Sequence, residues 1–172
     1  MSDSGILYNN PELTNNQNHC IENALQSKDY YLLQGPPGTG KTSTFLVKYI
    51  QELLKKPNEK LVVLAYTNKA VERICENFKQ PRSGKRIPYI RIGSKHVEDD
   101  YLFSNLLTDN NPDNWQRLLK ENPVLVSTVA TFKNNLLLLK QFIPYKQVVV
   151  DEASQLTEAD LAGVLSVFEK FV

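Results

Sequence analysis

Eight consecutive residues at positions 35–42, Gly-Pro-Pro-Gly-Thr-Gly-Lys-Thr, restrict the possible folds of this chain most strongly. They match the pattern GxxxxGK[ST], in which glycines let the backbone curl without a Cβ clash, so that successive N–H groups point inward. Such a run of donors, followed by the positive end of a helix, binds phosphate. An apolar segment precedes the run and a helical pattern follows it, as a phosphate loop requires. The predicted phosphate-contacting residues are Gly35, Pro36, Pro37, Gly38, Thr39, Gly40, Lys41 and Thr42.

Two side chains of this loop have separate expected roles. Lys41 is expected to reach the β- and γ-phosphates of ATP, and the hydroxyl of Thr42 is expected to ligate Mg²⁺. The sequence therefore predicts a site for ATP and Mg²⁺.

A second motif supplies carboxylates. Three valines at 148–150 read as a buried strand, and Asp151 and Glu152 follow directly. In a parallel sheet, ligands bind beyond the carboxyl ends of the strands, so both acids are expected beside the phosphate loop. Asp151 would hold Mg²⁺ through a water, and Glu152 would orient and deprotonate the attacking water. Two successive carboxylates favour an ATPase, and we predict Lys41, Asp151 and Glu152 as the catalytic residues.

The order of apolar patterns predicts the fold. Strand-like and helix-like segments alternate along 172 residues, which indicates one three-layer α/β domain with a parallel sheet covered on both faces. Residues 80–122 are expected to form a small irregular insertion, and residues 79–95 carry six basic side chains and no acid. The expected strands are 30–34, 61–66, 87–92, 124–128, 147–150 and the start of one at 171–172, and the expected helices are 15–27, 42–56, 69–78, 115–121 and 156–170.

Charge and composition exclude few classes of protein or partner. The chain has 20 basic and 19 acidic residues, so any basic binding surface must be local. Its apolar runs fall far short of the roughly 20 residues that span a membrane. The first residues resemble no secretory signal, and Cys20 and Cys75 form no metal-binding pair, so we expect a cytoplasmic or nuclear protein with reduced thiols.

The residues around the two motifs resemble the superfamily 1 helicases. Asp-Glu-Ala-Ser-Gln at 151–155 resembles their motif II, and the loop sequence at 35–42 is the form of motif I usual in the Upf- and Senataxin-like branch, superfamily 1B. Residues 65–71 look like motif Ia, residues 127–130 like the next motif, residues 91–93 like the intervening family strand, and residues 13–17 like the upstream Q motif. The resemblance covers most of residues 11–172, in the family order.

This resemblance implies the first RecA-like motor domain of a helicase, which couples ATP hydrolysis to 5′ to 3′ movement on single-stranded DNA or RNA. It implies that Gln17 contacts adenine and that Thr67, Asn68 and Thr128 lie along the nucleic acid. The sequence departs from the family at Thr14, where asparagine is usual. Motif III and the second RecA-like domain with its arginines would follow residue 172, so residues 1–172 are expected to be a partial motor domain that is nearly inactive alone.

Other interpretations remain open at this point. The two motifs also fit an AAA-type ATPase that remodels proteins, or a nucleotide-dependent binding module without catalysis. Residues 67, 68 and 128 are of types that also form loops and cap helices. The basic stretch 79–95, with Tyr89 inside it, could follow a nucleic-acid backbone or form a solvated loop.

Overall fold

The computed structural model describes residues 8–82, 84–93, 117–118, 120–142 and 145–172. Much of the expected insertion, including residues 94–116, and the start of the expected helix 115–121 lie outside these ranges. The helical elements are α1 (Asn15–Gln26), η1 (Lys41–Leu46), α2 (Val47–Leu53), α3 (Asn68–Lys79), α6 (Val129–Phe142), η2 (Ala153–Gln155) and α7 (Glu158–Leu165). The strands are β1 (Leu61–Ala65), β2 (Tyr89–Ile92), β3 (Val124–Thr128), β4 (Gln147–Asp151) and β5 (Lys170–Phe171).

The strands form one parallel sheet in the order β2-β3-β1-β4-β5. Ala65 at the end of β1 pairs with Thr128 on one side and with Asp151 on the other. The carboxyl ends of three neighbouring strands therefore meet at one edge of the sheet. This parallel arrangement confirms the predicted α/β class, and the register brings the predicted motifs to the same edge.

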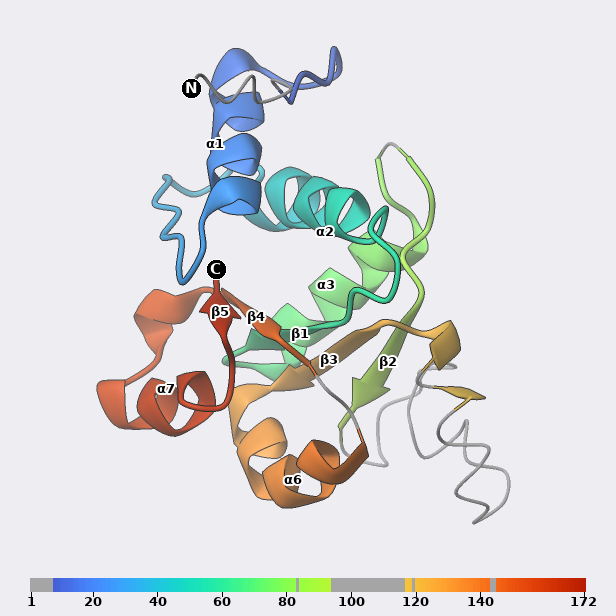
Figure 1. Ribbon diagram of the computed structural model, residues 1–172. Helices are drawn as coiled ribbons and strands as arrows, with labels where there is room; N and C mark the ends of the chain where they lie inside the picture. The colour runs from blue at the N-terminus through green and yellow to red at the C-terminus, as the bar shows by residue number, and fades with distance from the viewer. Residues whose placement is uncertain (1–7, 83, 94–116, 119, 143–144) are drawn as a thin grey trace, which may run out of the picture.

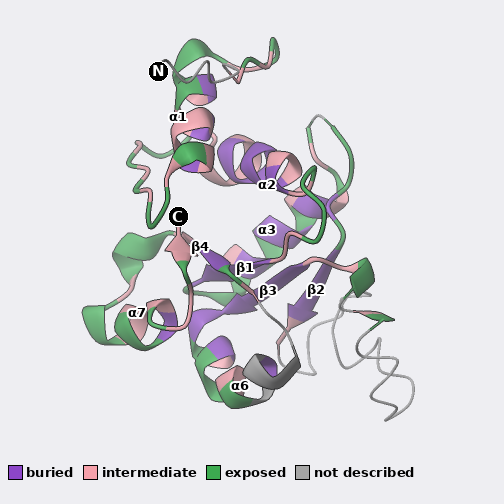
Figure 2. Ribbon diagram, viewed as in Figure 1, coloured by how far each residue is buried: buried purple, intermediate pink, exposed green. Residues whose placement is uncertain are grey.

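Helices cover both faces of the sheet, which gives the three predicted layers. Helices α1, α2 and α3 lie on one face, and α6 and α7 lie on the other (Figure 1). Two apolar clusters match these layers: Tyr49, Ile74 and Phe78 belong to the first, and Phe132 and Val164 to the second. The central strands are buried along their length (Figure 2). Burial of one large apolar side chain stabilises the folded state by about 1.5–3 kcal/mol.

Local side-chain caps explain where three helices begin. The Thr14 hydroxyl accepts a hydrogen bond from the Gln17 N–H, and Gln17 accepts one from the Thr14 N–H, so the two residues form a capping box at α1. Thr67 caps α3, and Thr157 caps α7 with a second capping box. These contacts satisfy N–H groups that have no partner inside the helix, and each is worth about 1 kcal/mol.

The predicted strand 30–34 is wrong as a regular sheet strand. Only Tyr30 forms a bridge, with Phe171, and the two rings stack with centroids 5.5 Å apart. The Tyr31 N–H donates to the Phe171 carbonyl at 3.0 Å, and Leu32 is 75% exposed. The segment before the phosphate loop thus lies outside β5, and β5 separates it from β4.

The predicted helix 156–170 is also wrong in its second half. Helix α7 ends at Leu165, and Lys170 lies in β5, where its ammonium donates to the Ala24 carbonyl at 2.6 Å. Phe168 lies after the end of α7, and its ring packs against Phe132. This packing explains why the apolar pattern of the sequence continues beyond the helix. Helix α6 was not predicted, and α2 ends three residues before the expected limit at position 56.

No helix among the described residues is long and apolar enough to cross a membrane.

Candidate active site

The loop at 35–42 has the backbone that its glycines predict. Gly38 and Gly40 have φ angles of 83° and 84°, which side chains rarely adopt. A Cβ atom on Gly40 would lie 2.9 Å from the Thr44 hydroxyl oxygen, so this position requires glycine sterically as well. A loop of this shape presents backbone N–H groups to an anion.

The helix after the loop starts with wide turns. The carbonyl of Gly40 accepts hydrogen bonds from the N–H groups of Thr44 and Phe45, at 2.8 and 2.9 Å. Residues Lys41–Leu46 form a π-helical segment before α2 continues the same helix. Such insertions occur frequently at functional sites, and the first N–H groups of any helix lack partners within it. These free donors are available to a phosphate group.

The ammonium of Lys41 lies folded back over the loop. It donates to the carbonyl oxygens of Gly35 and of Pro36, the latter at 3.1 Å. The Thr39 hydroxyl donates to the same Pro36 carbonyl at 2.8 Å. The carbonyl groups of the loop therefore hold the Lys41 ammonium beside the loop itself.

Thr42 contacts Asp151 directly. The hydroxyl of Thr42 donates to the Oδ2 atom of Asp151 at 2.8 Å, although the two residues are 109 positions apart in the sequence. Burial raises the pKa of Asp151 above its ordinary value, the Thr42 hydrogen bond opposes this shift, and the charge of Glu152 adds to it. The contact leaves the hydroxyl lone pairs of Thr42 available, and a buried carboxylate gains from a nearby cation. These two oxygen donors suit Mg²⁺.

Glu152 has a strained backbone. Its φ and ψ angles are 55° and 40°, a left-handed conformation that is uncommon for residues other than glycine, asparagine and aspartate. The residue is exposed and follows Asp151 at the carboxyl end of β4. Backbone strain of this kind clusters at functional sites.

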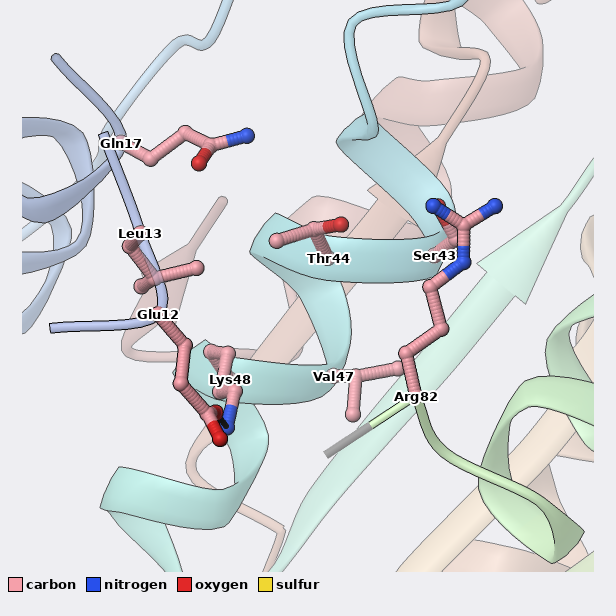
Figure 3. Close-up of a pocket in the computed structure, with 8 residues that line it drawn as sticks. All are labelled: Glu12, Leu13, Gln17, Ser43, Thr44, Val47, Lys48 and Arg82. Atoms are coloured by element: carbon pink, nitrogen blue, oxygen red, sulfur yellow. Dashed lines mark hydrogen bonds and ion pairs between the residues drawn. The ribbon is translucent and has the colours of Figure 1, made fainter. Parts of the chain in front are cut away.

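Gln17 lies close to the phosphate loop. Its side-chain nitrogen is 3.7 Å from the position that a Cβ atom on Gly40 would occupy. Gln17 also lines a cavity of about 410 Å³ beside the start of α2 (Figure 3). The Thr14 hydroxyl caps α1 in the way an asparagine would, so the departure from the family at this position keeps the local geometry.

Three charged residues of this cavity were not predicted from the sequence. The buried ammonium of Lys48 pairs with a carboxylate oxygen of Glu12 at 3.2 Å, and Arg82 lines the opposite side (Figure 3). The pair joins α2 to the segment before α1. Glu12 and Lys48 belong to no motif, whereas Arg82 lies in the basic stretch whose position the sequence left open.

The residues predicted along the nucleic acid lie at the same sheet edge but differ in exposure. Thr67 and Asn68 are exposed, and the Thr67 hydroxyl accepts from the Ala70 N–H at 3.1 Å. Thr128 is 7% exposed, and its hydroxyl accepts from the Thr131 N–H at 3.2 Å. Thr67 and Thr128 therefore cap helices, and the side chain of Asn68 is the most available of the three.

The basic stretch 79–95 is divided among several environments. Arg82 lines the cavity beside the loop, whereas Lys85 and Arg86 lie before β2, at the amino ends of the strands. Arg91 is 1% exposed and lies 3.8 Å from Glu72. Tyr89 is buried and packs edge-on against Phe78, so its ring is not available to stack on a base.

Comparison with known proteins identifies the family. A family model described as an AAA domain matches residues 12–111, more than half of the chain. The chain belongs to this AAA domain family. Its relatives and its fold make it a superfamily 1 helicase motor domain.

Two curated relatives and one solved structure illustrate the similarity. A DNA replication ATP-dependent helicase/nuclease of Arabidopsis thaliana is 28% identical over 169 residues, which are 96% of this chain and 12% of that protein. A regulator of nonsense transcripts 1 homolog of Neurospora crassa is 39% identical over 89 residues, 52% of this chain and 8% of that protein. The crystal structure of the UvsW helicase from bacteriophage T4 shares the fold with a TM-score of 0.58 and 14% identity, over 90% of this chain and 49% of that one.

This motor domain spans about a tenth of the length of these curated relatives.

Proposed function

We propose that this domain binds Mg²⁺–ATP and, as the first RecA-like motor half of a longer helicase, couples ATP hydrolysis to translocation on single-stranded DNA or RNA or to its unwinding. The contact between Thr42 and Asp151 beside the phosphate loop carries this proposal. It joins the two predicted magnesium-binding side chains across the fold. The motor-domain relatives named above support the nucleic-acid part.

Each residue of the site has a proposed role. Backbone N–H groups of residues 35–42 bind the phosphates, and Lys41 neutralises the β- and γ-phosphate oxygens. Thr42 and Asp151 hold Mg²⁺, which when bound neutralises charge that develops on the phosphates. Glu152 takes a proton from the attacking water. Gln17 contacts adenine in the cavity next to Gly40.

The carboxyl edge of the sheet is the proposed nucleic-acid surface. Asn68 and Thr67 lie directly after β1, next to the strand that carries Asp151. Short polar side chains at such positions bind phosphates and sugars without selecting sequence. The relatives are named for DNA replication and for nonsense transcripts, so both DNA and RNA remain substrates to test, and a nuclear or cytoplasmic location fits either.

A second RecA-like domain is a proposed partner in the same protein. Phosphoryl transfer spreads negative charge over three oxygens, and in related P-loop enzymes an arginine finger contributes about 10³–10⁵-fold to turnover. By the family resemblance these arginines come from the second motor domain. We therefore expect the 172-residue chain alone to bind ATP but to hydrolyse it at close to the background rate.

Calorimetry with ATP tests the site directly. The chain should bind ATP in a Mg²⁺-dependent manner, and Lys41→Ala should weaken binding by about ten- to hundredfold, because a hydrogen bond to a charged group is worth about 1.5–3 kcal/mol. Lys28→Ala, at an exposed lysine after α1, is the control and should bind as the wild type does. Equal affinity of the wild type and Lys41→Ala would reject the assignment.

A steady-state ATPase assay tests the motor function. The chain alone should give no stimulation by oligo(dT) or oligo(U), whereas the longer protein should respond to one of them. Stimulation of the longer protein by unfolded polypeptide, and by neither oligonucleotide, would favour a protein remodeller. Full stimulated turnover by residues 1–172 would show that a second domain is not required.

A further inference from the structure

A second cavity lies at the amino ends of the strands, on the side of the sheet away from the phosphate loop. Its volume is about 830 Å³, within the range of about 300–1,000 Å³ typical of sites that bury a small ligand. Three segments line most of it: residues 51–60, which cover the end of α2 and the turn before β1, residues 84–88 before β2, and residues 120–123 before β3. We refer to it as the amino-edge groove. It contains none of the predicted nucleotide or nucleic-acid residues.

The walls of this groove are tied to the core by hydrogen bonds. The side chain of Gln51 donates to the Lys85 carbonyl at 2.7 Å and packs against Gly84. The Ile87 N–H donates to the Phe78 carbonyl at 3.2 Å, and the Leu61 N–H to the Pro123 carbonyl at 3.1 Å. Ile87 itself is 3% exposed. A groove already ordered in the folded protein spares a ligand much of the cost of ordering its walls.

The lining is strongly cationic. Seven of its residues are lysine or arginine and three are glutamate. Because Lys48 is already paired with Glu12, the remaining excess is three positive charges, whereas the whole chain carries only +1. Two of the glutamates already have partners, because Glu52 pairs with Lys55 and Glu59 accepts from Gln147. Within the described residues, the ammonium groups of Lys56, Lys60 and Lys85 contact no hydrogen-bond or ion-pair partner. The groove thus attracts an anionic ligand.

The apolar part of the lining indicates which kind of anion fits. Leucine, isoleucine and three prolines lie between the lysines, at positions 54, 87, 57, 88 and 123. The described residues that line the groove include no aromatic side chain, so it lacks the stacking surface that single-stranded nucleic acids use. A lining that combines aliphatic and cationic side chains matches a peptide that alternates carboxylates with aliphatic side chains.

We propose that the amino-edge groove binds a short acidic peptide segment of a partner protein, with aliphatic side chains against the apolar part of the lining and carboxylates on the lysines. This docking site shares only Lys48 with the cavity beside the phosphate loop, and the proposal does not depend on the function proposed above. A partner bound there would leave the phosphate loop and the carboxyl edge open.

Fluorescence anisotropy tests the proposal with a labelled peptide in which Asp and Glu alternate with Leu. The 172-residue chain should bind this peptide, and the double variant Lys60→Glu and Lys85→Glu should lose about tenfold or more in affinity because charge complementarity is reversed. Lys28→Glu is the matched control, since it makes the same change of charge at an exposed lysine outside the groove, and it should bind the peptide as the wild type does. All variants should keep the wild-type affinity for Mg²⁺–ATP, which shows that they are folded.

Two further probes separate the alternatives. A peptide with Ser in place of Leu should bind more weakly, because the apolar part of the lining then has no partner. The affinity for a labelled oligo(dT) or oligo(U) should not fall specifically in the double variant. Absence of peptide binding, or equal losses in the double variant and in Lys28→Glu, would overturn the proposal. If only the oligonucleotide binds and the double variant abolishes that binding, the groove is a nucleic-acid site and the peptide assignment is wrong.

Discussion

The hydroxyl of Thr42 donates a hydrogen bond of 2.8 Å to the carboxylate of Asp151, which joins the helix after the phosphate loop to the end of β4. In the function proposed above, this contact would position two oxygen ligands for Mg²⁺ before the cation binds. Because Asp151 also pairs in register with Ala65 of β1, the sheet fixes the carboxylate and the helix fixes the hydroxyl.

Replacement of Asp151 by asparagine should stabilise the protein in the absence of Mg²⁺. Asparagine keeps an oxygen for the Thr42 hydroxyl and removes a carboxylate whose pKa is raised chiefly by burial. We expect the melting temperature at neutral pH to rise by about 2–4 °C, equivalent to about 1 kcal/mol in a domain of this size. The same variant should lose the Mg²⁺-dependent part of its ATP affinity in calorimetry.

The pH dependence of this stabilisation has a definite sign. A raised native pKa means that the folded protein holds the Asp151 proton more tightly than the unfolded chain. This group's contribution to stability is therefore lost as pH rises from 3.8, its ordinary value, through the native pKa. The stability of the asparagine variant relative to the wild type should therefore increase as pH rises through this range. An equal advantage at acidic and at neutral pH would rule out the charge as its cause.

Replacement of Glu152 by glutamine should reduce turnover while ATP binding persists. In the longer protein we expect kcat to fall by about 10²–10⁴-fold, the contribution of a positioned general base. Glutamine preserves size and hydrogen-bonding reach, so calorimetry should give nearly the wild-type affinity for Mg²⁺–ATP. An unchanged kcat would remove Glu152 from the mechanism.

Replacement of Glu152 by glycine tests the backbone strain. A left-handed residue with a Cβ costs about 1–2 kcal/mol, and glycine adds about 0.5–1 kcal/mol of unfolded-state entropy, so the net gain in stability is about 0.5–1 kcal/mol. Asn58 has a φ of 62° and is the matched position, where asparagine already tolerates this conformation. Chemical denaturation should therefore show a gain for Glu152→Gly and none for Asn58→Gly. A loss at both positions would show that Glu152 is not strained.

Alanine at Asn68 and at Thr128 should have different effects on stability. Thr128→Ala removes the cap of the Thr131 N–H and should cost about 0.5–2 kcal/mol, whereas exposed Asn68 should change stability by less than about 0.5 kcal/mol. In the longer protein both variants should weaken single-strand binding equally for all sequences. Thr128→Ser keeps the cap and is the control. A sequence-dependent loss, or no loss in Asn68→Ala, would contradict the proposed placement.

The sequence determined the parts of the site that are local. Residues 35–42 form the loop because Gly38 and Gly40 take φ angles that residues with a side chain rarely adopt. The strands 61–65 and 124–128 and the helix before the loop were predicted to within one residue, since each is defined by its own apolar pattern and bounded by a threonine cap or a turn. The two carboxylates were placed at a strand end because three consecutive valines at 148–150 directly precede them.

Only the tertiary structure decided which distant segments meet. Tyr30 pairs with Phe171 and Lys170 reaches Ala24, contacts that no local pattern indicates. Segment 156–170 has helical periodicity throughout, yet pairing with β4 converts its last residue into a strand. The basic residues of 79–95 are contiguous in sequence, but β2 buries Arg91 and leaves Lys85 in the amino-edge groove. Local sequence fixes backbone preference and caps, whereas sheet order and long-range packing depend on which apolar faces bury each other, and that is a property of the whole chain.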